Sequence, residues 1–101
     1  MKLEDRPCVV VGGGRVAIRK VTLLKRVGAR VKLVSPLLCE DLRVLADRGD
    51  IDHVAREFQD ADIDDCALVI AATDDVEVNL AISGLAVAGH IPVNVVNDPE
   101  S

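Results

Sequence analysis

The sequence predicts an α/β fold, a doubly wound parallel sheet of five strands, and three observations support this. Residues 8–11 and 67–72 are short apolar runs, as expected of strands that are buried on both faces. Between the strand segments, apolar residues recur at helical spacing. The connections are short, so right-handed crossovers require a parallel sheet with helices on both faces. We expect the strand order 3-2-1-4-5.

Three consecutive glycines separate the first strand from the first helix. We expect the strand at residues 6–11 and the helix at residues 15–27, and Gly28 suits the end of that helix. Gly12 can form the tight turn, and Gly14 lets a pyrophosphate approach the backbone. The N–H groups and positive dipole of the helix N-terminus then face the phosphates. This context is typical of a Rossmann-like dinucleotide-binding domain, and the alternative is a strand-to-helix turn without a ligand.

The remaining elements follow in order along the chain. The second strand ends at Ser35, because the proline after it cannot continue a hydrogen-bonded ladder. Asp74 and Glu77 resemble a capping box, with Asp74 as the N-cap of the last helix. We expect a strand at 30–35, a helix at 40–48, a weak strand at 52–56, a short helix or turn at 60–65, a strand at 67–72, a helix ending at 88 and a strand at 91–96.

Ligands of such sheets bind at the carboxyl ends of strands one and four, where the strand order reverses. Four stretches converge at this edge, residues 12–16, 35–37, 72–75 and 94–98. We therefore expect the dinucleotide to contact a set of residues in the first three stretches. They are Gly12, Gly13, Gly14, Arg15, Val16, Ser35, Pro36, Leu37, Thr73 and Asp74.

Other polar residues of the sheet are harder to interpret. The end of the second strand lacks the acid that usually holds the ribose hydroxyls, so the choice between NAD and NADP does not follow from these residues. Ser35 can form one hydrogen bond there. Asn94 interrupts an apolar strand and should find a partner, either a loop or the cofactor. We expect His53 and His90 to be structural or exposed, at the edge away from the site.

Asn97 and Asp98 directly follow the last strand. The carboxylate of Asp98 could act as a general base. Asn-Asp-Pro is also strong turn chemistry, which would give both residues a purely local role. Both interpretations stay open at this point.

Composition and charge exclude several classes of function. The net charge is −5, but residues 1–50 carry 11 Lys or Arg against 6 Asp or Glu, whereas residues 51–101 carry 1 against 11. The basic half contains the glycines and the first helix, which suits an anionic ligand. Phe58 is the only aromatic residue, so we expect no nucleic acid partner.

The sequence shows no sign of a membrane or metal protein. No apolar run approaches the roughly 20 residues of a membrane span, and residues 1–7 lack an apolar signal region. We expect no membrane partner and a cytoplasmic location. The three cysteines are widely spaced and match no zinc pattern, so we expect reduced thiols and no metal site.

Three motifs occur together: Val-Val-Val-Gly-Gly-Gly-Arg-Val-Ala-x-Arg-Lys from residue 9, Ala-Ala-Thr-Asp-Asp from residue 71 and Asn-Val-Val-Asn-Asp-Pro from residue 94. The combination resembles the siroheme synthase family, in particular its N-terminal precorrin-2 dehydrogenase domain. The resemblance implies an oxidoreductase that uses NAD⁺ to convert precorrin-2, a tetrapyrrole, to sirohydrochlorin in siroheme biosynthesis. Some members also insert ferrous iron as ferrochelatases. The resemblance further implies NAD contacts from backbone groups of Arg15, Val16, Pro36 and Leu37.

The chain departs from this family in two places. The family often has its candidate catalytic Asp where this chain has Asn97, with Asp98 one position later. The resemblance therefore makes Asp98 and Asn97 the candidate catalytic residues and leaves iron insertion open. Family members also continue into a helical dimerisation region. We expect residues 1–101 to form one NAD-binding domain, a fragment lacking that region, of a protein that is a homodimer when full length.

A second resemblance belongs to another functional class. Residues 71–80 resemble the nucleotide-sensing regulatory domains of potassium channels and transporters, which bind a nucleotide without reacting with it. Those domains typically have an acid at the place of Ser35 and a Gly-Asp-Ala-Thr stretch at residues 57–60. Both features are missing here, which favours the dehydrogenase. A dinucleotide fold that has lost its ligand is a third possibility.

Overall fold

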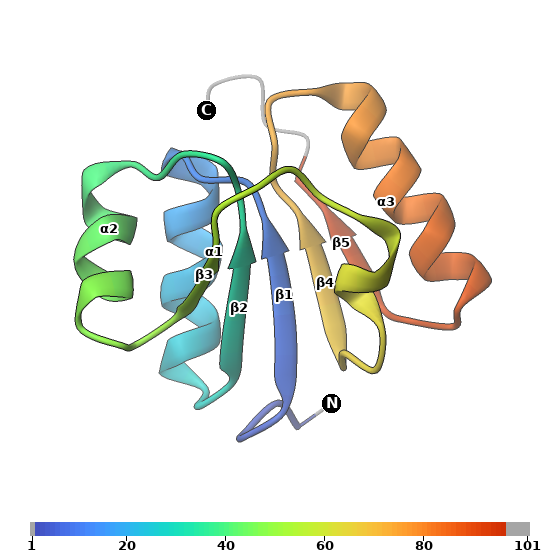
Figure 1. Cartoon of the computed structure of the whole chain (residues 1–101). Helices are drawn as coiled ribbons and strands as arrows, with labels where there is room; N and C mark the ends of the chain where they lie inside the picture. The colour runs from blue at the N-terminus through green and yellow to red at the C-terminus, as the bar shows by residue number, and fades with distance from the viewer. Residues whose placement is uncertain (1, 97–101) are drawn as a thin grey trace.

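The computed structural model describes residues 2–96, which form a parallel five-stranded sheet in the order β3-β2-β1-β4-β5 (Figure 1). The predicted α/β fold class and strand order are confirmed. The strands are β1 (Pro7–Val11), β2 (Arg30–Val34), β3 (Asp52–Val54), β4 (Leu68–Ala71) and β5 (Val93–Val95).

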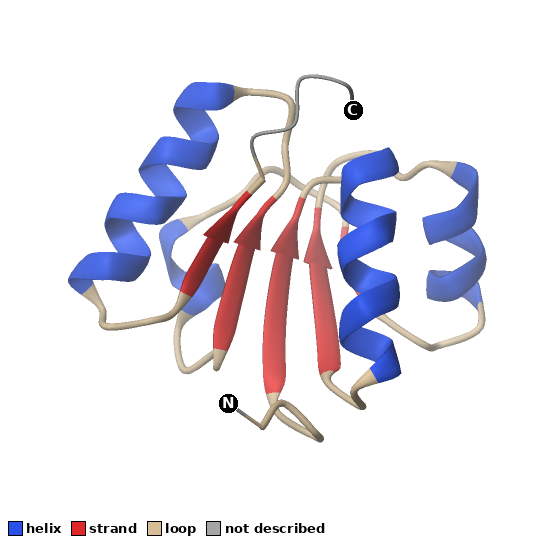
Figure 2. Cartoon of the chain, turned by 180° about the vertical axis from the view of Figure 1, so that it is seen from behind, coloured by secondary structure: helices blue, strands red, loops and turns tan. Residues whose placement is uncertain are grey.

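Helices cover both faces of the sheet, as right-handed crossovers require. In the two opposite views, α1 and α2 lie on one face, and α3 and the short 3₁₀ helix η1 lie on the other (Figures 1 and 2). The helices are α1 (Arg15–Arg26), α2 (Glu40–Asp47), η1 (Asp60–Ile63) and α3 (Val76–Ala88). None of the described helices is both long enough and apolar enough to cross a membrane.

The central strand β1 supplies side chains to two separate hydrophobic layers, because successive side chains of a strand point to opposite faces. Cys8 and Val10 pack in the layer under α1 and α2, whereas Val9 and Val11 pack in the layer under α3 and η1. β1 pairs with β2 on one side and with β4 on the other. The sheet is therefore buried on both faces around β1, as its apolar run predicts.

The outer strands are shorter than the sequence predicts. β3 covers three residues of the expected 52–56, and β5 covers three of the expected 91–96. Asn94 of β5 is exposed, and within residues 2–96 its side chain shows no partner, so the expected contact with a loop is not found in the described residues. β5 is an edge strand, and water can satisfy a polar side chain there.

The start of α3 also differs from the prediction. Asp75, not Asp74, is the N-cap, and its carboxylate accepts hydrogen bonds from the backbone N–H groups of Glu77 at 3.0 Å and Val78 at 3.3 Å. Both aspartates are suitable caps by type, so the sequence pattern does not choose between them. The Asp74 carboxylate therefore does not cap α3.

Candidate functional site

Three loops meet at the carboxyl edge of the sheet, around the end of β1. The N–H of Gly12 donates to Val34 O of β2 at 3.0 Å, and the N–H of Ala72 donates to Val11 O of β1 at 2.9 Å. The N–H of Val96 in turn donates to Ala71 O at 2.9 Å. The structure thus brings together residues 12–16, 35–37 and 72–75, as the sequence predicts.

The three glycines of the turn have different surroundings. Gly12 has φ +128°, and a Cβ there would overlap the carbonyl oxygen of Ala72. A Cβ on Gly13 would overlap the carbonyl oxygen of Leu37. No described atom lies within 4 Å of the place where a Cβ on Gly14 would stand. The turn therefore packs tightly at its first two glycines and opens onto free space at the third.

The N-terminus of α1 borders this free space. Gly14 is its N-cap, and no described side chain caps the helix by a hydrogen bond. The first turn of α1 contains no acidic residue and begins with the exposed Arg15. The first N–H groups of a helix have no partner within the helix, and the dipole makes this end positive. These residues fit a pyrophosphate, and the room at Gly14 is the space it would need.

The loop after β2 is fixed by its own hydrogen bonds. The hydroxyl of Ser35 donates to Leu37 O at 2.7 Å, and the N–H of Cys39 donates to Gly13 O at 2.7 Å. Ser35 is buried, whereas Leu37 is 78% exposed. The Ser35 hydroxyl hydrogen is therefore used within the loop, and the backbone of the loop is held against the glycine turn.

His53 of β3 contributes to the same loop, which the sequence analysis missed. Its Nε2 lies 2.8 Å from Ser35 O and must donate, because a carbonyl oxygen only accepts. The expectation that His53 is structural is consistent with this bond. The expectation that it lies away from the carboxyl edge is wrong, because His53 pairs with Leu33 near the end of β2 and its ring reaches Ser35 O.

The segment after β4 is held by a buried residue of α3. Asn79 bonds to both backbone groups and the hydroxyl of Thr73. Asp74 is exposed and forms no hydrogen bond or ion pair with any other residue in the part of the chain from 2 to 96. The spacing of Asn79, three residues before Ile82, indicates the buried side of the helix, but it does not indicate Thr73 as the partner.

Not every predicted site residue can be placed. Asn97 and Asp98, the candidate catalytic residues, lie outside the described residues. Thr73 and Asp74 do lie at the carboxyl edge beside the glycine turn. Within residues 2–96, no group of three or more His, Cys, Asp or Glu could hold a metal ion.

The described cysteines show no sign of catalytic activation. Burial raises the pKa of the Cys8 thiol, and burial likewise raises the pKa of the Cys66 thiol. A thiol is a nucleophile only as the thiolate, so both should be unreactive near neutral pH. All three cysteines are free.

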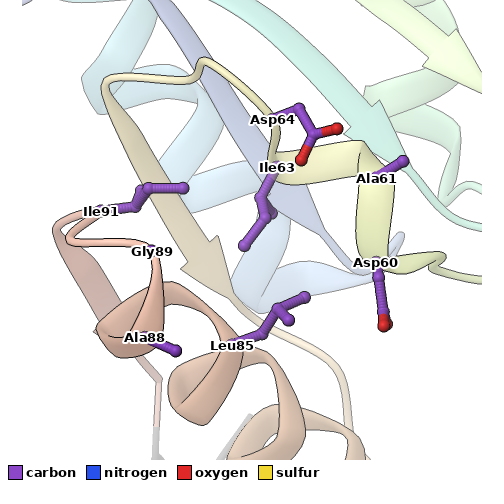
Figure 3. A pocket seen from close by; sticks show the side chains of 8 residues that line it. All are labelled: Asp60, Ala61, Ile63, Asp64, Leu85, Ala88, Gly89 and Ile91. Atoms are coloured by element: carbon purple, nitrogen blue, oxygen red, sulfur yellow. The ribbon is translucent and has the colours of Figure 1, made fainter.

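A pocket of about 480 Å³ lies elsewhere, between η1, the end of α3 and the loop that connects α3 to β5 (Figure 3). Ile63, Leu85 and Ile91 are among its lining residues. None of the three loops of the carboxyl edge lines it. This pocket is therefore separate from the candidate cofactor site, which is an open surface at the edge of the sheet.

Comparison with known proteins finds an NAD(P)-binding family model and relatives named siroheme synthase. The family model described as "Putative NAD(P)-binding" matches residues 1–101. The chain is 55% identical over 100 residues to a siroheme synthase of Thioalkalivibrio sulfidiphilus, covering 99% of this chain and 20% of that protein. It is 56% identical over 100 residues to a siroheme synthase of Methylobacillus flagellatus, covering 99% and 21%. The chain thus spans about a fifth of the length of these curated relatives.

A solved structure supports the fold. "SirC, precorrin-2 dehydrogenase" superposes with a TM-score of 0.79 at 22% sequence identity, covering 100% of this chain and 48% of that one. The same sheet and helices therefore occur in a chain of low sequence identity. The siroheme synthase relatives agree with the first of the two resemblances in the sequence and do not favour the potassium-transport alternative.

Proposed function

This chain belongs to the NAD(P)-binding family whose model matches all of its residues, and from that membership we propose that it is the NAD-binding domain of a precorrin-2 dehydrogenase. The observation that carries the proposal is the N-terminus of α1, which no described side chain caps, together with the space that the described residues leave at Gly14. The relatives named siroheme synthase support the pathway, and the relative solved as a precorrin-2 dehydrogenase supports the reaction.

In this proposal, different stretches at the carboxyl edge bind different parts of the dinucleotide. Backbone N–H groups of Arg15 and Val16 bind the pyrophosphate, and the Arg15 guanidinium adds positive charge. Backbone groups of residues 35–37 contact the adenosine ribose. Residues 34–37 carry neither the acid typical of ribose recognition nor a Lys or Arg for a 2′-phosphate. These residues therefore do not by themselves choose between NAD and NADP.

The proposed reaction removes a hydride and a proton from the reduced tetrapyrrole. NAD⁺, when bound, supplies the acceptor for the hydride. The chain must then bring the tetrapyrrole to the carboxyl edge, exclude water there and accept a proton. We assign the proton to the carboxylate of Asp98, because the amide of Asn97 cannot exchange one near neutral pH. Asp74, exposed at the same edge, is the other carboxylate to be tested.

The substrate and assembly belong to the same proposal. The tetrapyrrole is large, and the described edge is open, so a further region should help to enclose it. The curated relatives are about five times as long as this chain, which supports such a region. We propose that the full-length protein works as a homodimer and that the 101 residues alone turn over poorly. Iron insertion is not part of the proposal.

The test is turnover of precorrin-2 with NAD⁺ by the product of the full reading frame, followed by NADH absorbance. We expect NADH to form with precorrin-2 and not without it. Asp98→Ala should lower the rate by about 10²–10⁴, the usual contribution of one acid or base. Asn97→Ala should cost much less, as should Asp74→Asn. Turnover unchanged in Asp98→Ala would contradict the base assignment, and no NADH formation by the parent would contradict the function.

A further inference from the structure

The side chain of Asn79, which is buried on α3, forms hydrogen bonds to the backbone N–H, the backbone carbonyl and the hydroxyl of Thr73 at the carboxyl edge. Asn79 Oδ1 accepts from the Thr73 N–H at 3.1 Å and from the Thr73 hydroxyl at 2.7 Å. Asn79 Nδ2 donates to Thr73 O at 2.9 Å. Asn79 is only 5% exposed. The amide thus satisfies both backbone groups of a residue that lies beyond the end of β4, where the sheet no longer pairs them.

The segment held in this way packs against the glycine turn. A Cβ on Gly12 would lie 3.2 Å from the Thr73 nitrogen and would overlap the carbonyl oxygen of Ala72. The Asp75 N–H donates to the Thr73 hydroxyl at 3.2 Å, which links the segment to the N-cap of α3. An unbroken series of contacts therefore runs from Asn79 through Thr73 to Gly12.

Local energetics alone do not explain an asparagine at this position. Asn79 shares the buried side of α3 with Ile82 and Ala86, both apolar. Asparagine is a weaker helix former than leucine or alanine, and burying an amide is unfavourable unless it is hydrogen-bonded. All of the bonds that offset this cost go to Thr73 rather than to the core. The residue is suited to fixing the segment, not to stabilising the helix.

We propose that Asn79 is a positioning residue, which holds the segment 72–75 against the glycine turn and thereby sets the affinity for the dinucleotide. The effect on affinity rests on the proposed function, whereas the effect on the glycine turn does not. Asn79 itself touches no substrate and acts through Thr73 and Gly12. Two measurements separate these parts.

The first measurement is calorimetric titration with NAD⁺ at a temperature at which every variant is folded. Asn79→Ala should raise the Kd for NAD⁺ by about tenfold, the equivalent of one net hydrogen bond. Ile82→Val is the matched control, since Ile82 is fully buried on the same helix and lies in the core. It should lower the Tm and leave the Kd unchanged. Equal Kd values in Asn79→Ala and the parent would overturn the proposal.

A charged variant gives a signature that a merely structural role would not produce. In Asn79→Asp the carboxylate faces Thr73 O without a donor, so NAD⁺ should bind weakly at neutral pH. Protonation restores an O–H donor while the other oxygen still accepts, so the affinity should recover as the pH falls. Position 79 is only 5% exposed, and burial disfavours the charged carboxylate and so favours its protonation. The parent is titrated at each pH, and no recovery relative to it would count against the geometry.

The second measurement needs no ligand. In an amide NMR spectrum, Asn79→Ala should shift the Gly12 and Gly13 signals and speed hydrogen exchange at Thr73, whereas Ile82→Val should not. If the parent fails to bind NAD⁺ but these shifts occur, the proposed function is wrong and the positioning role stands. If the Gly12 and Thr73 signals are unchanged, the positioning role is overturned. Should Asn79→Ala not fold, Asn79→Asp at low and neutral pH replaces it.

Discussion

Gly12, Gly13 and Gly14 are adjacent, yet the structure requires glycine at each for a different reason. Gly12 combines a positive φ with contact to the segment after β4. Gly13 has an ordinary φ, but the loop after β2 lies where its side chain would be. Gly14 has neither restriction, since its φ is −108° and no atom of the described residues lies within 4 Å of the place of its Cβ. Only the third glycine leaves room for a ligand, so it is the one at which binding and folding can be separated.

The different surroundings of Gly13 and Gly14 predict different changes in the free energy of unfolding when each is replaced by alanine. Gly13→Ala should destabilise the fold by about 1–3 kcal/mol, the usual cost of overpacking, because Leu37 O and Ser35 Oγ must move. Gly14→Ala should change stability by less than about 1 kcal/mol, because glycine and alanine both tolerate this extended conformation. Denaturant unfolding of both variants tests this. Equal losses in the two would mean that the loop after β2 does not pack on Gly13.

At the scale of elements, an ion pair between the partly exposed Arg56 and the buried Asp62 holds the crossover from β3 to β4. The Arg56 guanidinium donates to both oxygens of Asp62 at 2.8 Å and 2.6 Å, and the Gln59 N–H donates at 2.7 Å. Lys32 of β2 lies 3.9 Å away. The Asp62 side chain is 4% exposed. These bonds attach η1 to the sheet, because Asp62 belongs to η1 and Lys32 to β2.

The pair predicts a particular dependence of stability on pH. The hydrogen bonds from Arg56 lower the pKa of the Asp62 carboxyl from its ordinary value of 3.8. Its contribution to stability is complete above the pKa of the unfolded chain and is lost as the pH falls through the lower folded pKa. Asp62→Asn should therefore be less stable than the parent at neutral pH, with the difference shrinking below pH 3.8.

Denaturant unfolding of parent and Asp62→Asn across that range measures the difference directly. Asp64→Asn, at an exposed residue one position past η1, is the control and should show a much smaller difference at neutral pH. A stability difference for Asp62→Asn that is independent of pH would contradict the assignment of the shift to the ion pair.

The elements also show what the sequence could and could not predict. Apolar runs, alternation, helical spacing and glycines predicted the strands and helices of residues 2–96, although residues 60–65 were expected only as a short helix or turn and β3 and β5 were expected to be longer. The cap of α3 was misplaced by one residue, because Asp74 and Asp75 have the same chemistry and only the path of the backbone distinguishes them. Asn79 and His53 were not recognised as holding the site, because their partners are six and 18 residues away.

At the scale of the whole molecule, the sheet order explains where the site lies. β1 is central, and the chain crosses from it to β2 on one side and later to β4 on the other. The helices that follow β1 and β4 therefore leave on opposite faces, which opens the carboxyl edge between them. The two helix starts there differ, since Asp75 caps α3 whereas no side chain among residues 2–96 caps α1. An anion is thus expected at α1 and not at α3.

The difference in charge between α1 and α3 also favours an anion at the N-terminus of α1. α1 carries five basic residues and no acidic one, whereas α3 carries a single charged residue, which is acidic. Summed over a surface, such an imbalance raises the local concentration of an anionic ligand. The basic residues lie on α1, whose first N–H groups face the space at Gly14. The electrostatic field of these residues and the hydrogen-bond donors of the helix therefore favour an anion at the same position.

The central claim is that a nicotinamide dinucleotide binds at Gly14, and titration of NADH fluorescence against the chain tests it most directly. The chain has no Trp or Tyr, so the signal comes from the ligand. The parent should enhance the fluorescence in a saturable way. Gly14→Val should fold as the parent does and bind at least about tenfold more weakly, because the side chain fills the space for the pyrophosphate. Gly84→Val, at an exposed glycine of α3 with equal room, should bind as the parent does. Equal binding by Gly14→Val and the parent would contradict the account.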